Sequence, residues 1–328
     1  MAPEYLFIRI LETCNADCFM CGFRLSKDRY RLSLNALEGI LSRVKKEGIR
    51  YIRLTGGEPL VHAEIVEFIR LIRQQGMKSS IITNGFLLEK KVGALAEAGL
   101  DQVIVSIDAA RPQTHDEIRN TRGLFERATA GLREAMRGGV MGRVNTVCGP
   151  GNFREMPALQ DLLTAWGVSQ WELSSLKLER KLDYTEQDQR EIEEVVEYVY
   201  REAPKANRLV PMGKVWCGET AGERARYFAT GITPRADGTC LLVDKVRYLD
   251  AKNNQLYACS LIPHRPGAWD YAAPGLPPEE FSVLEPNIMN QAAYFKYAGP
   301  SVCTGCSTTA AGYSNQLRSN EMLSPWSF

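Results

Sequence analysis

Hydrophobic residues in the first half of the chain alternate between short continuous runs and stretches with helical spacing. Short apolar runs are typical of buried strands, and apolar positions three or four apart are typical of amphipathic helices. Strands are predicted at residues 5–11, 51–54, 79–83, 102–107, 143–147 and 170–174. Helices are predicted at residues 34–46, 63–75, 90–98, 124–137 and 156–166. This alternation predicts an α/β fold in which helices cover a parallel sheet.

The number of repeats limits the possible architectures. About six strand–helix units are too few for a closed eight-stranded barrel. An open curved sheet or partial barrel fits them, and so does a doubly wound sheet. In each case the functional groups are expected at the C-terminal ends of the strands.

The pattern changes after residue 184. Residues 185–203 read as a charged amphipathic helix, whereas 231–328 are rich in Gly, Pro, Asn and Ser. Short strand-like runs remain at 240–243 and 246–249, and one helical stretch lies near 288–297. We therefore expect a first domain at 1–184, a helical linker at 185–230 and a small irregular α+β domain at 231–328. Small segments with little core often require a bound metal.

Composition excludes several classes of protein. The 328 residues are 45% hydrophobic, which argues against a disordered chain. Forty basic and 39 acidic residues leave a formal charge of +1, so neither nucleic acid nor an anionic membrane is an expected partner. No apolar run approaches the roughly 18 to 20 residues that span a bilayer, and no secretory signal is recognisable. We expect a cytoplasmic protein.

Cysteine is the informative residue type. The chain has nine cysteines but only three histidines, which weakens the case for a His-based zinc enzyme. Disulfides are disfavoured in the cytoplasm, so grouped cysteines are expected to bind metal or to do redox chemistry.

Cys14, Cys18 and Cys21 follow the first predicted strand within eight residues. A structural zinc ion takes four closed ligands, so zinc would require a distant fourth cysteine. A four-iron cluster held by three thiolates would keep one iron open to another ligand.

The CxxxCxxC spacing of these cysteines resembles the radical S-adenosylmethionine (SAM) superfamily. Further motifs of that family follow in the same order, and the resemblance covers residues 5 to about 180. It implies a partial (β/α)6 barrel of the TIM type. The matching residues are Gly56, Gly57, Glu58 and Pro59 (GGEP), Thr83 and Asn84 (ITNG), Ser106 and Asp108 (VSID), and Asn145 (VNTV).

The residue types at these positions suggest binding roles on chemical grounds alone, without the resemblance. Glycines at a strand end let the backbone approach a ligand closely. Glu58 could accept hydrogen bonds from an ammonium group, or it could be a solvated loop carboxylate. Ser106 and Asp108 are two positions apart and therefore share one strand face. Strand capping is the alternative role for these small polar residues.

The resemblance assigns SAM contacts to several of these residues. Glu58 is expected to meet the SAM amino group, and Ser106 to lie near the ribose or methionine portion. Arg119 matches a SAM-contacting arginine of relatives, with a surface ion pair on a helix as the alternative. Met20 replaces the usual aromatic residue near adenine, and its thioether can make the same apolar contact. The predicted cofactor-binding set is Met20, Gly56, Gly57, Glu58, Pro59, Thr83, Asn84, Ser106, Asp108, Arg119 and Asn145.

A second group comprises Cys240, Cys259, Cys303 and Cys306, with 18, 43 and 2 residues between them. Four thiolates can saturate a zinc ion or a four-iron cluster, and spacing does not choose between these. The order is similar to the twitch domain, a shortened SPASM-type extension of some radical SAM enzymes. That similarity implies an auxiliary [4Fe-4S] cluster, although a ligand set that includes Cys217 is an alternative.

Cys148 and Cys217 remain. Cys148 ends an apolar strand and is predicted to be a small buried residue. Cys217 could be buried, could bind a cluster, or could donate a hydrogen atom to a substrate radical. In the last role it would be the catalytic residue.

The resemblance implies two [4Fe-4S] clusters, with SAM bound to the open one. An external reductase such as flavodoxin would supply one electron, and a 5′-deoxyadenosyl radical would then remove hydrogen from a substrate. The expected substrate is a carbohydrate, aminoglycoside or nucleoside of antibiotic biosynthesis. Because Cys217 is left over, a redox-neutral outcome is favoured, namely epimerisation or decarboxylation of a sugar acid. An acidic sugar would suit Lys177, Arg180, Lys181, Lys205, Arg208 and Lys214.

Three other functions remain open. Two-electron dehydrogenation of a sugar or cyclitol alcohol would use the same machinery. A peptide maturase would need a separate recognition partner. A non-catalytic iron–sulfur or zinc protein would not need the GGEP and VSID motifs.

Overall fold

The computed structural model describes residues 4–176, 184–202, 210–212, 245–253 and 255–257. Within them, nine strands form one sheet in the order β7-β6-β5-β4-β3-β2-β1-β8-β9. The strands are β1 (Tyr5–Leu11), β2 (Tyr51–Gly56), β3 (Lys78–Thr83), β4 (Gln102–Ser106), β5 (Met141–Cys148), β6 (Gln170–Ser175), β7 (Val210–Met212), β8 (Val246–Asp250) and β9 (Gln255–Tyr257). The helices are α1 (Leu34–Lys46), α2 (Ile65–Gln74), α3 (Leu88–Ala98), α4 (Pro112–Ile118), α5 (Leu124–Arg137), α6 (Met156–Ala165) and α7 (Glu186–Glu202).

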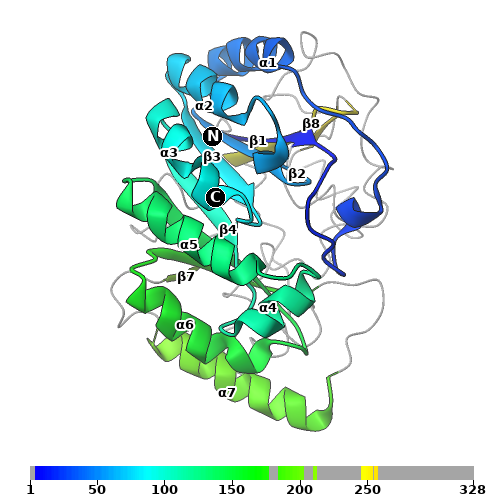
Figure 1. The fold of residues 1–328 in the computed structure, drawn as a ribbon, viewed down its shortest axis with the longest axis vertical. Coiled ribbons are helices and arrows are strands. Elements are labelled where there is room, and N and C mark those ends of the chain that lie inside the picture. Colours follow the sequence, from blue (N-terminus) through cyan, green and yellow to red (C-terminus); the bar gives the residue numbers. More distant parts are fainter. Residues whose placement is uncertain (1–3, 177–183, 203–209, 213–244, 254, 258–328) are drawn as a thin grey trace.

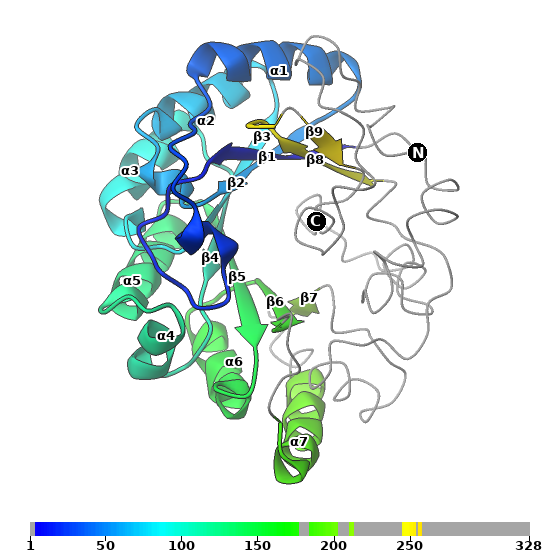
Figure 2. The same ribbon diagram turned by 90° about the vertical axis from the view of Figure 1, so that its right-hand side faces the viewer.

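The first six strands lie side by side in chain order, and all their pairings are parallel. Helices follow each of these strands and cover the convex face of the curved sheet (Figures 1 and 2). A doubly wound sheet would reverse its strand order and carry helices on both faces. The partial barrel is therefore confirmed, and the doubly wound alternative is wrong.

The two faces of the sheet differ in chemistry. Leu6, Ile8 and Leu54 belong to the apolar core packed against the helices, because alternate side chains of a strand point to opposite faces. The concave face carries polar side chains instead. There Arg53 donates from Nε to Ser80 Oγ at 3.0 Å and from Nη2 to Gln102 Oε1 at 3.2 Å. A polar belt thus crosses the interior of the partial barrel.

Two of the strands complete the sheet at the β1 edge. β8 pairs with β1 in parallel, with Arg9 opposite Asp250, and β9 pairs with β8 in an antiparallel hairpin. The sequence pattern predicted a strand at 246–249 but assigned it to the C-terminal segment. The structure instead places this strand in the core sheet, because its apolar residues complete the surface that β1 would otherwise expose.

The sequence pattern missed α4, β7 and β9. Each has seven residues or fewer, which is too short for hydrophobic periodicity to register. The predicted strand at 240–243 and helix at 288–297 lie outside the described residues, so the domain boundaries at 185 and 231 stay predictions. Among the described helices, none combines the length and the apolar character that a membrane span requires.

Substitution of Leu95 tests the apolar layer between sheet and helices. Leu95 is fully buried in α3, so Leu95→Ala should lower the free energy of unfolding by about 2–5 kcal/mol. Leu25 is 70% exposed, and Leu25→Ala should change the free energy of unfolding by less than about 0.5 kcal/mol. Chemical denaturation of both variants measures the difference, and equal effects would contradict the assignment of the core.

Candidate active site

The loop after β1, residues 12–33, carries the first three cysteines and is called the cysteine loop below. Cys18 is buried, while Cys14 and Cys21 are half-buried, and all three thiols are free. Burial raises the pKa of the Cys14 thiol to about 11 and also raises that of Cys18. Without a bound metal, these two thiols are therefore protonated at neutral pH. The short turn at Gly22–Leu25 follows the third cysteine directly.

Hydrogen-bond donors from other loops point at two of the sulfurs. Asn84 Nδ2 lies 3.9 Å from Cys14 Sγ, and Arg119 Nη1 lies 3.9 Å from Cys18 Sγ. The backbone amide of Ala16 also donates to Cys14 Sγ, at 3.5 Å. Donors at these positions stabilise negative charge on sulfur, which is the state that binds metal.

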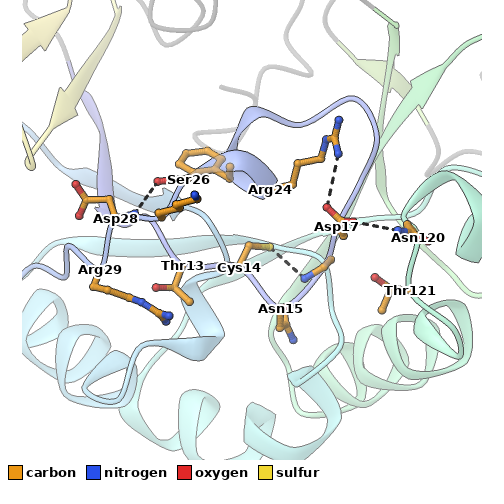
Figure 3. Close-up of a pocket in the computed structure, with 13 residues that line it drawn as sticks. Thr13, Cys14, Asn15, Asp17, Arg24, Ser26, Asp28, Arg29, Asn120 and Thr121 are labelled. Atoms are coloured by element: carbon orange, nitrogen blue, oxygen red, sulfur yellow. Dashed lines mark hydrogen bonds and ion pairs between the residues drawn. The ribbon is translucent and has the colours of Figure 1, made fainter.

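A cavity of about 740 Å³ opens beside Cys14 (Figure 3). The arch of the cysteine loop forms one wall, and the turn after α4 forms another. Its volume lies within the range of small-molecule sites. The lining residues are Thr13, Cys14, Asn15, Ala16, Asp17, Phe23, Arg24, Ser26, Lys27, Asp28, Arg29, Asn120 and Thr121.

Two glycines at the end of β2, Gly56 and Gly57, hold the start of the cysteine loop. A Cβ atom on Gly57 would overlap the Thr13 carbonyl, and one on Gly56 would overlap the Leu11 carbonyl. Gly57 N donates to Leu11 O at 3.0 Å, and Glu58 N donates to Thr13 O at 2.9 Å. The glycines were expected to let the backbone approach a ligand closely. In the structure the segment that they approach is the start of the cysteine loop.

Glu58 is buried and gathers donors from two neighbouring segments. It accepts hydrogen bonds from Thr83 Oγ1 at 2.6 Å, from Asn84 N at 2.7 Å and from Leu60 N at 2.9 Å. Burial nevertheless raises the pKa of this carboxyl above its usual value. The alternative of a solvated loop carboxylate is wrong. Pro59 begins the short turn Pro59–Val61 that follows.

Asn84 connects this cluster to the cysteine loop. Besides its approach to Cys14, its Nδ2 donates to Asn15 Oδ1 at 2.8 Å. Its Oδ1 accepts from Phe86 N at 2.9 Å, which fixes the orientation of the amide. Glu58, Asn84 and Cys14 therefore form one continuous chain of contacts.

Asp108 and Arg119 form a second anchor. Asp108 is fully buried, accepts from Arg119 Nε at 2.7 Å and also accepts from Val147 N at 2.9 Å. Burial opposes the charged form of Arg119, but the Asp108 carboxylate outweighs it and raises the pKa of Arg119. The ion pair expected as an alternative for Arg119 exists, but it is buried beside Cys18 and does not lie on a helix surface.

Three more predicted residues lie at the same end of the sheet. Ser106 and Asn145 are opposite each other in the β4–β5 register, and both are half-buried. Ser106 is the last residue of β4, and Asp108 lies beyond that strand. Met20 is half-buried in the cysteine loop between Cys18 and Cys21.

An ion-pair network attaches the hairpin β8–β9 to the cysteine loop. Arg9 pairs with Asp250 at 2.8 Å and also with Glu12. Lys252, in the turn after β8, reaches Asp28 at 2.7 Å. Sequence reasoning missed this network because Asp250 and Lys252 lie more than 200 residues from their partners Arg9 and Asp28. It also missed the cavity-lining Asn120 and Thr121, for which adjacency to Arg119 was the available signal.

The chemistry of these residues fits an iron–sulfur cluster with a nucleotide cofactor. Three free thiols lie in one loop, two of them face N–H donors, and a cavity of nucleotide size borders one. In the described part of the chain, however, no three Cys, His, Asp or Glu side chains lie close enough together to hold one metal ion. The ligand role of the cysteines stays a prediction.

Several predicted site residues lie outside the described residues. They are Cys217, Cys240, Cys259, Cys303 and Cys306, and the six basic residues from Lys177 to Lys214.

Comparison with known proteins gives an independent result. Residues 8–163 match the family model of the Radical SAM superfamily. A probable GTP 3′,8-cyclase of Saccharolobus islandicus is 33% identical over 202 residues, which is 60% of this chain and 65% of that relative. A GTP 3′,8-cyclase of Microcystis aeruginosa is 37% identical over 146 residues, covering 42% of this chain and 44% of the relative. The chain therefore spans less than two thirds of the length of these relatives.

Solved structures with low sequence identity share the fold. anSMEcpe with bound AdoMet superposes with a TM-score of 0.67 at 16% identity, covering 96% of this chain and 95% of that one. Streptococcus suis SuiB bound to S-adenosylmethionine gives a TM-score of 0.61 at 18% identity, covering 80% and 61% of the two chains.

Substitution of Gly57 tests whether the close backbone contact positions the cysteine loop. Gly57→Ala should displace the loop and lower iron incorporation on anaerobic reconstitution by at least about half, since the Cβ would sit inside the backbone of residues 12–13. Gly22 lies in the same loop but has no atom within 4 Å of a built Cβ, so Gly22→Ala is the matched control. Iron content equal to wild type in Gly57→Ala would contradict this role.

Proposed function

From the premise that residues 8–163 are a radical SAM superfamily domain, we propose that the protein is an enzyme that cleaves SAM. The radical formed would then remove a hydrogen atom from a sugar-containing substrate. The observation that carries the proposal is the cavity bordered by Cys14, beside three free thiols on one loop. When bound, SAM and its [4Fe-4S] cluster supply a 5′-deoxyadenosyl radical that attacks an unactivated C–H bond.

In this proposal Cys14, Cys18 and Cys21 hold the cluster, and Asn84 and Arg119 donate toward the first two sulfurs. Donors to sulfur tune the redox potential of such clusters. Glu58 has three protein donors, so a SAM amino group would use the remaining lone-pair direction of its carboxylate. Ser106 and Asn145, half-buried on the concave side, would line the remainder of the cofactor site.

The concave face supports a polar or anionic substrate. Arg143 on β5 is 4% exposed, donates from Nε to Asn145 Oδ1 at 3.0 Å and pairs with Glu172 through Nη2. Its Nη1 is buried and has no hydrogen-bond partner among the described residues. A buried donor without a partner is costly, and an acceptor-rich ligand would satisfy it. Sugar hydroxyls, carboxylates and phosphates all supply such acceptors.

The relatives favour a nucleoside or sugar over a peptide. Those with 33–37% identity are named for GTP, which contains a ribose joined to a base and to phosphates. The structural neighbours that include peptide complexes share only 16–18% identity, so they inform on the fold alone. A peptide maturase with a separate partner therefore remains the weaker alternative.

The redox-neutral outcome rests on the C-terminal cysteines. Cys240, Cys259, Cys303 and Cys306 would bind an auxiliary [4Fe-4S] cluster, which leaves Cys217 available as a hydrogen-atom donor to the substrate radical. Epimerisation or decarboxylation of a sugar acid would follow from such a donor. Dehydrogenation of a sugar or cyclitol alcohol is the alternative outcome, in which the auxiliary cluster accepts the second electron.

Anaerobic reconstitution with iron and sulfide tests the cofactor set. We expect about eight irons per chain, from two four-iron clusters, and formation of 5′-deoxyadenosine under dithionite. Cys14→Ala should lower iron to about four and abolish 5′-deoxyadenosine formation. Cys148 is buried at the end of β5 and is not part of either predicted cluster set, so Cys148→Ala should retain both properties. Wild-type protein that reconstitutes but does not cleave SAM would refute the proposal.

Deuterium-labelled nucleosides and sugar acids test the substrate class. Deuterium transfer into 5′-deoxyadenosine identifies the attacked carbon, and transfer from a peptide alone would select the maturase. Cys217→Ala should leave this transfer intact but stop the redox-neutral product from forming. Unchanged product formation by Cys217→Ala would show that this cysteine is not the donor.

A further inference from the structure

Residues 22–29 of the cysteine loop come directly after Cys21 and have little core of their own. All of them except Phe23 are exposed, and none belongs to the apolar core. A segment with few buried contacts takes its position from the polar and ring contacts that join it to the rest of the fold. Within the described residues, two such contacts reach outside the loop, one at Phe23 and one at Asp28.

Phe23 packs against Arg9 of β1, and two buried carboxylates hold Arg9 in place. The guanidinium Cζ lies 5.0 Å from the centre of the Phe23 ring. Its Nη1 pairs with Asp250 of β8 at 2.8 Å, and its Nη2 pairs with Glu12. Asp250 is 0% exposed and Glu12 is 2% exposed. Both terminal nitrogens of the guanidinium are therefore occupied, and its planar face is left for the ring.

The hairpin β8–β9 supplies the partner that orients Arg9 (Figure 2). Asp250 is the last residue of β8, and it also accepts from Asn253 Nδ2 in the turn at 2.9 Å. A buried carboxylate without its partner is costly, so Asp250 keeps Arg9 in the conformation that faces Phe23. The position of the ring thus depends on a residue 241 positions away from Arg9 in sequence.

The contact at Asp28 is the weaker of the two. Lys252, in the turn after β8, pairs with Asp28 at 2.7 Å, but these side chains are 29% and 41% exposed. An exposed ion pair contributes little, because water screens it and two side chains lose conformational freedom. The Arg9 side chain is only 15% exposed, so its contact with Phe23 is the main link between the hairpin and the loop.

The three cysteines of the loop differ in how they are held. Donors from other loops approach the sulfurs of Cys14 and Cys18, each at 3.9 Å. Within the described residues, no such donor approaches the sulfur of Cys21. The turn Gly22–Leu25, which carries Phe23, follows this cysteine directly. The position of the ring therefore limits where Cys21 can lie.

We propose that Arg9 is a positioning residue for Cys21. Through Phe23 it anchors the turn after this cysteine, so that the third thiol stays near the other two when a cluster binds. The inference rests on the proposed function in one respect, because a cluster at the three cysteines gives this position its use. Phe23 also lines the cavity beside Cys14, so the same contact shapes that cavity. The hairpin β8–β9 is then a working part of the active site as well as an edge of the sheet.

The rate of iron loss to a chelator tests the role of the ring. In protein reconstituted with Cys303→Ala/Cys306→Ala, only the first cluster is expected to report. Phe23→Leu should raise its rate of iron loss by about tenfold, whereas Phe23→Tyr keeps a ring over Arg9 and should match the parent protein. Arg9→Lys retains the charge between the two carboxylates but has no planar face, and it should resemble Phe23→Leu. Iron loss at the parent rate in Phe23→Leu would overturn the proposal.

Lys245→Ala is the matched control on the same hairpin. Lys245 pairs with Glu4 at 2.8 Å, just before β8 begins and at the other end of that strand from Asp250. Loss of this ion pair should leave the rate of iron loss unchanged. An increase equal to that of Phe23→Leu would mean that any loosening of the hairpin has the same effect, and the specific role of Arg9 would be wrong.

A double variant tests whether Asp250 and Phe23 act through Arg9. Asp250→Asn should also raise the rate of iron loss, because Arg9 loses a charged partner. Combined with Phe23→Leu, it should raise the rate no further than Phe23→Leu alone, since both changes interrupt the same contact. Effects that multiply in the double variant would be independent of each other and would contradict this role of Arg9.

Alkylation of the metal-free full-length protein separates this inference from the proposed function. Phe23→Leu should raise the rate at which iodoacetamide modifies Cys21, relative to Cys14 in the same molecules, by about threefold or more. If this change occurs but reconstituted wild type does not cleave SAM, the proposed function is refuted and the role of Arg9 stands. If wild type cleaves SAM while Phe23→Leu changes neither alkylation nor iron loss, the role of Arg9 alone is refuted.

Discussion

The close contact between Gly56–Gly57 and the start of the cysteine loop is the constraint on which the site depends. Neither glycine position has space for a Cβ, because the carbonyls of Leu11 and Thr13 lie against them. The contact lets Gly57 N donate to Leu11 O at the end of β1, and Glu58 N donate to Thr13 O in the loop. It therefore fixes the path of the chain after the end of β1, and with it the position of Cys14.

Two buried carboxylates extend this constraint to the neighbouring strands. Glu58 gathers the end of β3 through Thr83 and Asn84, and Asn84 reaches Cys14. Asp108 accepts a hydrogen bond from Val147 N near the end of β5 and holds Arg119, which reaches Cys18. Each carboxylate has several donors, which compensates for its burial. The sulfurs are thus positioned from two sides by groups that are themselves held in place.

Sequence reasoning predicted the strand–helix order well because hydrophobic periodicity is local. It also singled out Glu58, Asn84, Asp108 and Arg119, which the structure brings to the C-terminal end of the sheet beside the cysteines. The partners of those residues were not predictable, since Glu58 meets Thr83 and Asp108 meets Val147 only in the folded chain. The pairing of β8 with β1, between positions 241 residues apart, left no local signal either.

The central claim is that the cysteine loop holds an open iron–sulfur cluster to which SAM binds. Electron paramagnetic resonance of reduced protein carrying Cys303→Ala and Cys306→Ala tests it most directly, because the expected auxiliary cluster is then removed. The account predicts a four-iron signal whose g-values shift when SAM is added. A signal that SAM leaves unchanged, or a protein that binds zinc in place of iron, would contradict it.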